Sequence, residues 1–279
     1  MNKLYFKSFM TYFLMFPSIF IGILAMISYG VTPSIWIQNI LIWLLGTVLG
    51  FIYLVRSNRD NSSKGNSFHT IVMLALLVFP LLFNGIDDVQ RWLPIGPINI
   101  YIASIILPLL IIHVWKLAIN HHELHVIGIT FFALVILLFQ PDAGQVTAFA
   151  CALVIILCKN IGNRSLKSIM LIFITAVVII SWVYLDDLAA VPYVEHIIFL
   201  VADMGKAWFI LGILSLILLL FPFLFSSNAT SGSLSLGIYF FMMMIVTFFG
   251  HFPMPVMGYG ISPVIGYLIA ITWVNKMSR

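Results

Sequence analysis

The sequence predicts an all-α polytopic membrane protein of about ten transmembrane helices, forming one integral membrane domain over residues 1–279. Hydrophobic residues make up 62% of the chain and charged residues only 8%. Soluble domains carry about a quarter charged residues, so this composition is typical of an integral membrane protein. The mean hydropathy is +1.14. The apolar residues also fall into runs close to the roughly 20 residues that a spanning helix needs.

Turn-forming segments separate the apolar runs and set their limits. Loops such as 56–67 (RSNRDNSSKGNS) and 226–232 (SSNATSG) are rich in turn residues. Two of the runs are short, which favours tilt, a locally thin bilayer or shielding by neighbouring helices. The predicted spans are 9–30, 34–55, 68–85, 99–119, 124–140, 145–158, 168–185, 206–225, 233–250 and 262–275.

The distribution of charge predicts that both chain ends face the cytoplasm. With ten spans and alternating sides, every basic residue except Arg91 and Lys206 falls on the inner side. Among the acidic residues, only Asp60 and Glu123 do so. If one span had been missed, the loops after it would change sides and this asymmetry would be lost. The net charge of +4 is therefore a topology signal, and we expect no nucleic-acid partner.

Four polar segments gather on the predicted outer side. They are NGIDDVQRWLPIGP (84–97), FQPDAGQ (139–145), DDLAAVPYVEH (186–196) and HFPMPVMGYGIS (251–262). Their prolines end helices, and their glycines permit turns and close backbone approach. Irregular backbone at membrane depth survives only where protein or a water-filled cavity covers it. We therefore expect an outer vestibule that could hold a polar head group whose lipid tail lies in the bilayer.

The remaining polar residues do not indicate a metal or nucleotide site. The stretch NHHEL at 120–124, with His125 after it, does not have the H-E-x-x-H order that zinc hydrolases use. It lies at a predicted cytoplasmic helix end, where such residues suit the helix dipole. The chain contains no phosphate loop, no dinucleotide fingerprint and no Ser–His–Asp pattern. We accordingly predict no metal-ligating residue.

In their order, the outer segments resemble the motifs of the SEDS family (shape, elongation, division and sporulation), the FtsW-, RodA- and SpoVE-type proteins. Asn84-Gly85, followed by Arg91-Trp92, resembles the family's N-G-A-x-R-W segment with a short insertion. Gln140-Pro141-Asp142, then Gly144, matches its Q-P-D-x-G motif. PVMGYGISP at 255–263 is similar to its P-F-x-S-Y-G-G-S-S ending. Residues 191–205 resemble a degenerate copy of its L-P-E-x-x-T-D-F segment. The chain is identified as a short and divergent member, and the ten-span, N-in/C-in topology is also the family's.

The resemblance implies a role in peptidoglycan synthesis, in cell division or shape control. SEDS proteins polymerise lipid II, the undecaprenyl-linked disaccharide-peptide, at the outer face of the bacterial cytoplasmic membrane. They usually work beside a class B penicillin-binding protein. Their glycosyltransferase chemistry calls for a carboxylate base at the acceptor hydroxyl. It also calls for cationic or divalent-metal help at the leaving pyrophosphate.

The sequence departs from the family pattern where the catalytic acid should be. Counting from Pro192, the family's T-D pair falls on His196 and Ile197. Glu195 lies two residues before the expected position and Asp203 six after it. The stretch aligned with the family's charged pair in the fourth span, 101–107, is uncharged, and the outer loop after the seventh span is short.

These departures leave three functions open. The first is a compact glycosyltransferase. The second is a catalytically silent protein that binds an undecaprenyl-linked precursor or a partner, for regulation or immunity. The third is a small lipid translocase or transporter, for which we find no inverted repeat.

The candidate residues follow from these motifs. The candidate catalytic base is Glu195, with Asp142 as runner-up. A plainer role for Asp142 is to cap the N-terminus of the sixth span. For Arg91 the plainer role is a structural salt bridge with an outer carboxylate. The candidate substrate-binding residues are Arg91, Trp92, Gln140, Asp142, Tyr259 and Ser262.

Overall fold

In the computed structural model of the chain, the described residues are mainly helical and include one small β-hairpin at residues 92–101. It describes residues 3–57, 67–86, 89–96, 98–186, 188–225 and 230–278. Asp87, Asp88 and Asp187, which the sequence assigns to the outer side, lie outside these ranges. The helices are α1 (Lys3–Phe13), α2 (Phe16–Ser28), α3 (Pro33–Arg56), α4 (Ser67–Val78) with the 3-10 turn η1 (Phe79–Leu82), α5 (Ile102–Ile119), α6 (Glu123–Phe139), α7 (Ala143–Asn160), α8 (Arg164–Val183), α9 (Ile197–Asp203), α10 (Lys206–Leu224), α11 (Ser231–Val246) and α12 (Ile261–Met277).

The predicted polytopic all-α membrane fold is confirmed. Six helical stretches of the described residues are long and apolar enough to cross a membrane. The other predicted spans correspond to shorter apolar helices at Phe68–Leu82, Glu123–Phe139, Ser231–Val246 and Ile261–Met277. The sixth span is longer than predicted, because α7 begins directly after its cap at Asp142.

Three local features differ from the predicted spans. The first span is broken after Phe13 into α1 and α2, and α2 begins with Pro17 in its first turn, a position that proline tolerates. The fourth span was predicted to start at residue 99, but 98–101 is strand β2 (Ile98–Tyr101), paired with β1 (Trp92–Ile95). The short helix α9 follows the polar segment 186–196.

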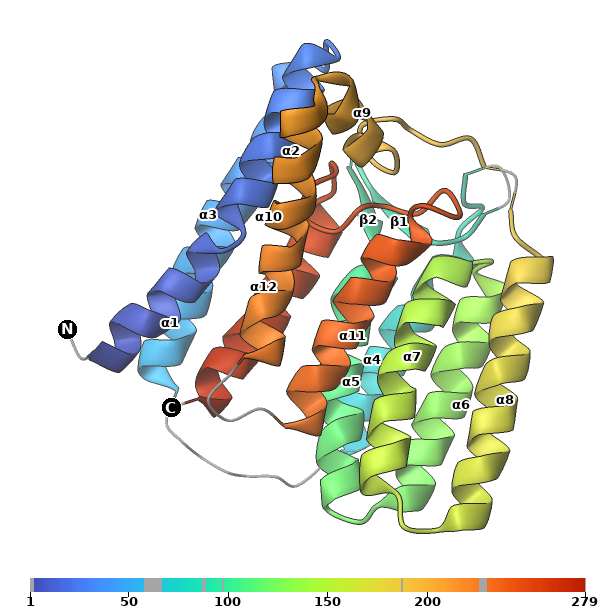
Figure 1. The fold of residues 1–279 in the computed structure, drawn as a ribbon. Coiled ribbons are helices and arrows are strands. Elements are labelled where there is room, and N and C mark those ends of the chain that lie inside the picture. Colours follow the sequence, from blue (N-terminus) through green and yellow to red (C-terminus); the bar gives the residue numbers. More distant parts are fainter. Residues whose placement is uncertain are drawn as a thin grey trace. The chain divides into compact units, whose positions relative to one another are not determined.

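The helices form two compact units. The first unit holds α1–α3, α9, α10 and α12; the second holds the β-hairpin, α4–α8 and α11 up to Met242. In the second unit α7 packs against α5, α6 and α8 (Figure 1). The side chains of α7 are mostly buried. In the first unit α12 packs along α3, and α10 packs against α2 and α9.

The two chain ends lie together in the first unit. The Asn275 amide, near the end of α12, donates to the carbonyl oxygen of Ser8 in α1 at 3.1 Å. The Lys276 ammonium donates to Ser57, the residue that follows α3, at 2.6 Å. Both chain ends and the end of α3 thus share one side, as an even number of crossings requires. That this side is cytoplasmic stays a prediction from the charge pattern.

Candidate functional site

Asp142 lies in the tight turn between α6 and α7 and caps α7. Its carboxylate oxygen Oδ1 accepts a hydrogen bond from the backbone N–H of Gln145 at 3.1 Å. An acidic side chain at this position satisfies one of the free amides of a helix start and complements the helix dipole. The capping role expected for Asp142 is therefore present in the structure.

The other carboxylate oxygen of Asp142 accepts a short hydrogen bond from the hydroxyl of Tyr101. Tyr101 is the last residue of β2, and both side chains are buried. Burial raises the pKa of Asp142, although Arg91 and the two hydrogen bonds oppose the shift. Burial and the neighbouring carboxylate raise the pKa of Tyr101 well above its ordinary value, so this phenol remains a proton donor.

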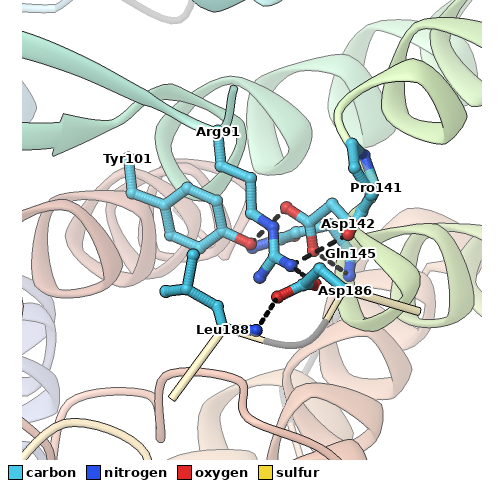
Figure 2. A network of polar contacts seen from close by, with 7 residues as sticks. All are labelled: Arg91, Tyr101, Pro141, Asp142, Gln145, Asp186 and Leu188. Atoms are coloured by element: carbon cyan, nitrogen blue, oxygen red, sulfur yellow. Dashed lines mark hydrogen bonds and ion pairs between the residues drawn. The ribbon is translucent and has the colours of Figure 1, made fainter. Parts of the chain in front are cut away.

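Arg91 enters the same cluster from the start of the hairpin (Figure 2). Its guanidinium forms an ion pair with Asp186 and donates to the backbone carbonyl of Pro141 at 2.9 Å. The Asp186 carboxylate also accepts from the N–H of Leu188 at 3.1 Å. Only 2% of Arg91 is exposed. The predicted ion pair between Arg91 and a carboxylate is thus present, and its partner is Asp186.

The sharp turn before Arg91 explains the Asn-Gly motif. Gly85 has a φ of 68°, in the left-handed region that favours glycine. A Cβ added at Gly85 would lie 2.4 Å from the carbonyl oxygen of Val89, so no other residue fits there without a shift. Backbone hydrogen bonds between Ile86 and Val89 close the turn in both directions. The Asn-Gly turn therefore positions Arg91 beside Asp186 and Pro141.

A second layer of buried polar groups supports Asp142 from inside the helices. The Gln145 amide donates to Ser104 of α5 at 3.0 Å and accepts from the Tyr239 hydroxyl of α11 at 2.7 Å. The Gln140 amide donates to the carbonyl oxygen of Leu77 in α4 at 2.5 Å. These contacts connect three helices, α4, α5 and α11, to the turn that carries Asp142. The sequence motifs do not single out Gln145 or Tyr239 as partners, although Gln145 ends the polar segment 139–145 and Tyr239 is a tyrosine inside an apolar run.

The predicted site residues of the second unit therefore lie together. Arg91, Gln140 and Asp142 are all buried, and Trp92 is half-buried, with its ring 5.6 Å from the Arg91 guanidinium carbon. Trp92 also pairs with Tyr101 across the hairpin. We call Arg91, Tyr101, Asp142, Gln145 and Asp186 the charged network. Its carboxylates are bound by an arginine, a tyrosine and backbone amides. The arrangement can anchor the hairpin and the end of α8 against the α6–α7 turn.

Glu195, the candidate base, lies in the first unit within a turn before α9. Its carboxylate accepts from the backbone N–H of Val191 at 2.7 Å, and the residue is 8% exposed. The same turn is closed by the N–H groups of Val194 and Glu195, which both donate to the carbonyl oxygen of Val191. Asp203, the alternative acid, is the last residue of α9 and is exposed.

The segment 252–260, which carries Tyr259, runs back along this turn. The N–H of Met254 donates to Val194 and that of Tyr259 to Tyr193, at 3.2 and 2.9 Å. The Tyr259 hydroxyl donates to the side chain of Gln38 in α3 at 3.0 Å. Tyr259 is half-buried, whereas Ser262, in the first turn of α12, is buried. Gln38 was not anticipated from the sequence; its only signal is an amide early in an apolar helix.

No protein-family model matches the sequence, and no curated protein matches it. Solved structures do match. The Rod shape determining protein RodA of Thermus thermophilus has a TM-score of 0.71 at 16% identity, over 96% of this chain and 95% of that one. An aspartate-to-alanine mutant of that protein matches equally well. A chain of a peptidoglycan synthase complex that coordinates polymerization and crosslinking has a TM-score of 0.62 at 19% identity, over 95% of this chain and 96% of that one. The predicted likeness to the SEDS family is confirmed at the level of the fold.

Proposed function

We propose that this protein is a SEDS-like component of bacterial peptidoglycan synthesis that binds lipid II at the outer side of the cytoplasmic membrane. The observation that carries the proposal is the RodA-like fold over nearly the whole chain. Two of the sequence motifs that resemble the SEDS family also meet in that fold. Arg91 of the first motif contacts the backbone of Pro141 in the second, as expected if both motifs maintain one structure.

For polymerisation, Glu195 is the better placed of the two candidate bases. The carboxylate would take the proton of the acceptor 4-hydroxyl while that oxygen bonds to the anomeric carbon of the donor. The bond from that carbon to the undecaprenyl pyrophosphate breaks, and the pyrophosphate leaves with the electron pair. Asp142 is fully buried and bound by Tyr101 and Gln145, which suits a structural carboxylate better than a base.

A catalytically silent lipid II-binding protein is the second candidate, and a specific observation favours it. The Glu195 carboxylate accepts a backbone hydrogen bond that closes its own turn. A base must instead reach the hydroxyl that it deprotonates, within about 3 Å. In this reading Glu195 shapes the turn, and the protein regulates wall synthesis or protects lipid II.

The described residues do not offer a ready site for a divalent cation. Among them, no three His, Cys, Asp or Glu side chains are grouped closely enough to hold a metal ion. Asp186 is paired with Arg91, and Asp142 is bound by Tyr101. We therefore assign no step of the reaction to a metal. Charge at the leaving pyrophosphate would need another source, such as a helix N-terminus or a cationic side chain.

A class B penicillin-binding protein is the proposed partner. The support is the fold shared with a chain of a peptidoglycan synthase complex that coordinates polymerization and crosslinking. A partner of this kind would cross-link the strands that the polymerase makes. If the present chain is catalytically silent, it would still recruit or hold the cross-linking enzyme.

The test is glycan polymerisation from lipid II by the purified protein, alone and with its cognate penicillin-binding protein. If the chain is a polymerase with Glu195 as base, Glu195→Gln lowers the rate by about 10²- to 10⁴-fold. In that case Asp203→Asn, which removes the exposed alternative acid at the end of α9, leaves the rate unchanged. Absence of product in both conditions, with lipid II binding intact, would exclude the polymerase and leave the silent binder.

A further inference from the structure

Two half-buried tyrosines lie next to each other where two irregular segments of the first unit meet. Tyr193 belongs to the turn before α9 and Tyr259 to the segment before α12. Their ring centroids are 6.2 Å apart, and the ring planes are inclined by 57°. We call these two residues the tyrosine pair. Tyr193 is not among the residues that the sequence motifs single out as substrate-binding, so its role is open.

The backbone beneath the tyrosine pair is held firmly. The N–H of Tyr259 donates to the carbonyl oxygen of Tyr193 at 2.9 Å. A Cβ added at the neighbouring Gly258 would lie 2.3 Å from the carbonyl oxygen of Val194, so the two segments approach as closely as glycine allows. The relative position of the two rings is thus set by the main chain as well as by side-chain packing.

Asn39 fixes the same segment from α3. Its side chain is fully buried, and its amide donates to the carbonyl oxygen of Gly258 at 3.0 Å. Its oxygen accepts from the N–H of Gly260 at 3.2 Å. A buried amide in an apolar spanning helix is costly, and here both of its polar ends are matched to non-helical backbone. Because Asn39 is hydrogen-bonded to the residues on either side of Tyr259, it is a positioning residue for that ring.

Gln38 adds a polar group beside the tyrosine pair. Its oxygen accepts from the Tyr259 hydroxyl at 3.0 Å, and its amide nitrogen donates to the carbonyl oxygen of Ser34 at 2.7 Å. Burial and the neighbouring Tyr193 raise the pKa of Tyr259, so its phenol stays protonated and donates this bond. Gln38 is half-buried. An amide oxygen has two lone pairs, and the Tyr259 hydroxyl occupies one, so the oxygen can accept from a further donor.

Aromatic faces next to an amide and a phenol are suited to a sugar ring. The C–H face of a pyranose is weakly electropositive and packs on the electron-rich face of an aromatic ring. Its hydroxyl and N-acetyl groups need neutral donors and acceptors, which amides and phenols provide. A pyrophosphate would instead favour charge-assisted donors such as arginine. We propose that Tyr193, Tyr259 and Gln38 form a subsite for a sugar of the lipid-linked precursor, with Asn39 positioning Tyr259. This inference rests on the proposed function.

The experiment compares ligands with and without the sugars. The full-length protein in lipid nanodiscs is titrated with lipid II, with undecaprenyl pyrophosphate and with the soluble disaccharide-pentapeptide. Tyr193→Leu should weaken lipid II binding about 3- to 10-fold, the value of one aromatic contact, and leave undecaprenyl pyrophosphate binding unchanged. Tyr193→Phe keeps the ring and should retain most of the affinity. Gln38→Met should act in the same direction as Tyr193→Leu, with a smaller effect.

Thr47→Val is the matched control on the same helix as Gln38 and Asn39. Thr47 is buried, and its hydroxyl has no hydrogen-bond partner among the described residues, so this change should alter neither folding nor binding. Melting temperatures of all variants in the same nanodiscs separate loss of the subsite from loss of the fold. The ratio of the two lipid affinities reports on the sugar alone, because a general structural defect would weaken both ligands.

The outcomes separate this inference from the function on which it rests. If Tyr193→Leu leaves lipid II binding unchanged, or weakens both lipids equally, the subsite is wrong and Tyr193 is an interfacial aromatic residue. The proposed function would still stand. If the folded wild-type protein binds lipid II no better than undecaprenyl pyrophosphate, sugar recognition is also ruled out. If it binds neither lipid, the proposed function fails. The subsite then stands only if the soluble disaccharide-pentapeptide binds in a Tyr193-dependent manner.

Discussion

The two units use polar groups in different ways at the ends that the charge pattern places outside. The second unit brings a guanidinium and two carboxylates together in the charged network, where they bind one another, a tyrosine and backbone amides. The first unit holds its irregular segments with the Asn39 amide, backbone hydrogen bonds and the Glu195 carboxylate, which closes its own turn, and its tyrosine pair stays half-buried. Polar groups that bind one another within the protein stabilise its structure, whereas side chains that stay partly exposed can contact a ligand. We therefore assign scaffolding to the charged network and recognition to the tyrosine pair.

The largest expected effect comes from removing the cation of the charged network. Arg91→Met leaves the Asp186 carboxylate, whose side chain is only 9% exposed, without its cationic partner, and breaking a buried ion pair in this way typically costs about 3–5 kcal/mol. Thermal unfolding in detergent should show a marked loss of melting temperature. Lys159→Met, which removes an exposed charge at the end of α7, should have little effect.

A double variant tests whether that loss of melting temperature comes from the Asp186 carboxylate that has lost its cation. Combining Arg91→Met with Asp186→Leu removes both charges, and the melting temperature should recover part of the way. If the two single losses simply add, Arg91 stabilises the protein through other contacts, and the scaffolding assignment is wrong in its mechanism.

The next effect comes from the cap of α7. Asp142→Ala removes an N-cap, at about 0.5–2 kcal/mol, and also removes the carboxylate that accepts the hydrogen bond of the buried Tyr101 hydroxyl, at about 1–3 kcal/mol. Lipid II affinity of the protein that remains folded should change far less than stability does. A large loss of affinity at unchanged melting temperature would move Asp142 from the scaffold to the recognition site.

In the first unit, the close approach beneath the tyrosine pair predicts an intermediate effect. Gly258→Ala forces a Cβ against the carbonyl oxygen of Val194 and should cost about 1–3 kcal/mol, the usual price of overpacking. Gly128→Ala in α6 is the control, because nothing lies within 4 Å of its added Cβ. Alanine there should be neutral or slightly stabilising, as in other helix interiors. Equal unfolding temperatures for the two variants would contradict the description of this segment.

The smallest expected effect is a pH dependence. The pKa of Asp142 is raised above its ordinary value of 3.8, so the native state holds this proton more tightly than the unfolded chain does. This contribution to stability is largest at low pH and is lost as pH rises from 3.8 through the raised pKa. The melting temperature of the wild-type protein minus that of Asp142→Asn should therefore fall with rising pH across this window. A difference that rises with pH would mean that Asp142 is stabilised as an anion.

Sequence patterns predicted the spans well because burial in lipid requires long apolar runs, which are visible in the sequence. They also located Arg91 and Asp142, since charged residues in so apolar a chain are conspicuous. They could not supply Tyr101 as the partner of Asp142, or Ser104 as the partner of Gln145, because pairings across 41 residues depend on how helices pack. The hairpin was missed because Ile98–Tyr101 continues directly into the apolar run of α5. Asn39 was a visible polar residue within a span, but its role depends on a segment more than 200 residues away.

The most direct test of the account is lipid II binding by the folded wild-type protein in nanodiscs. We expect saturable binding, tighter than that of undecaprenyl pyrophosphate, and retained when the charged network is altered conservatively, as in Asp142→Asn. The account is contradicted if the folded protein shows no saturable binding of lipid II.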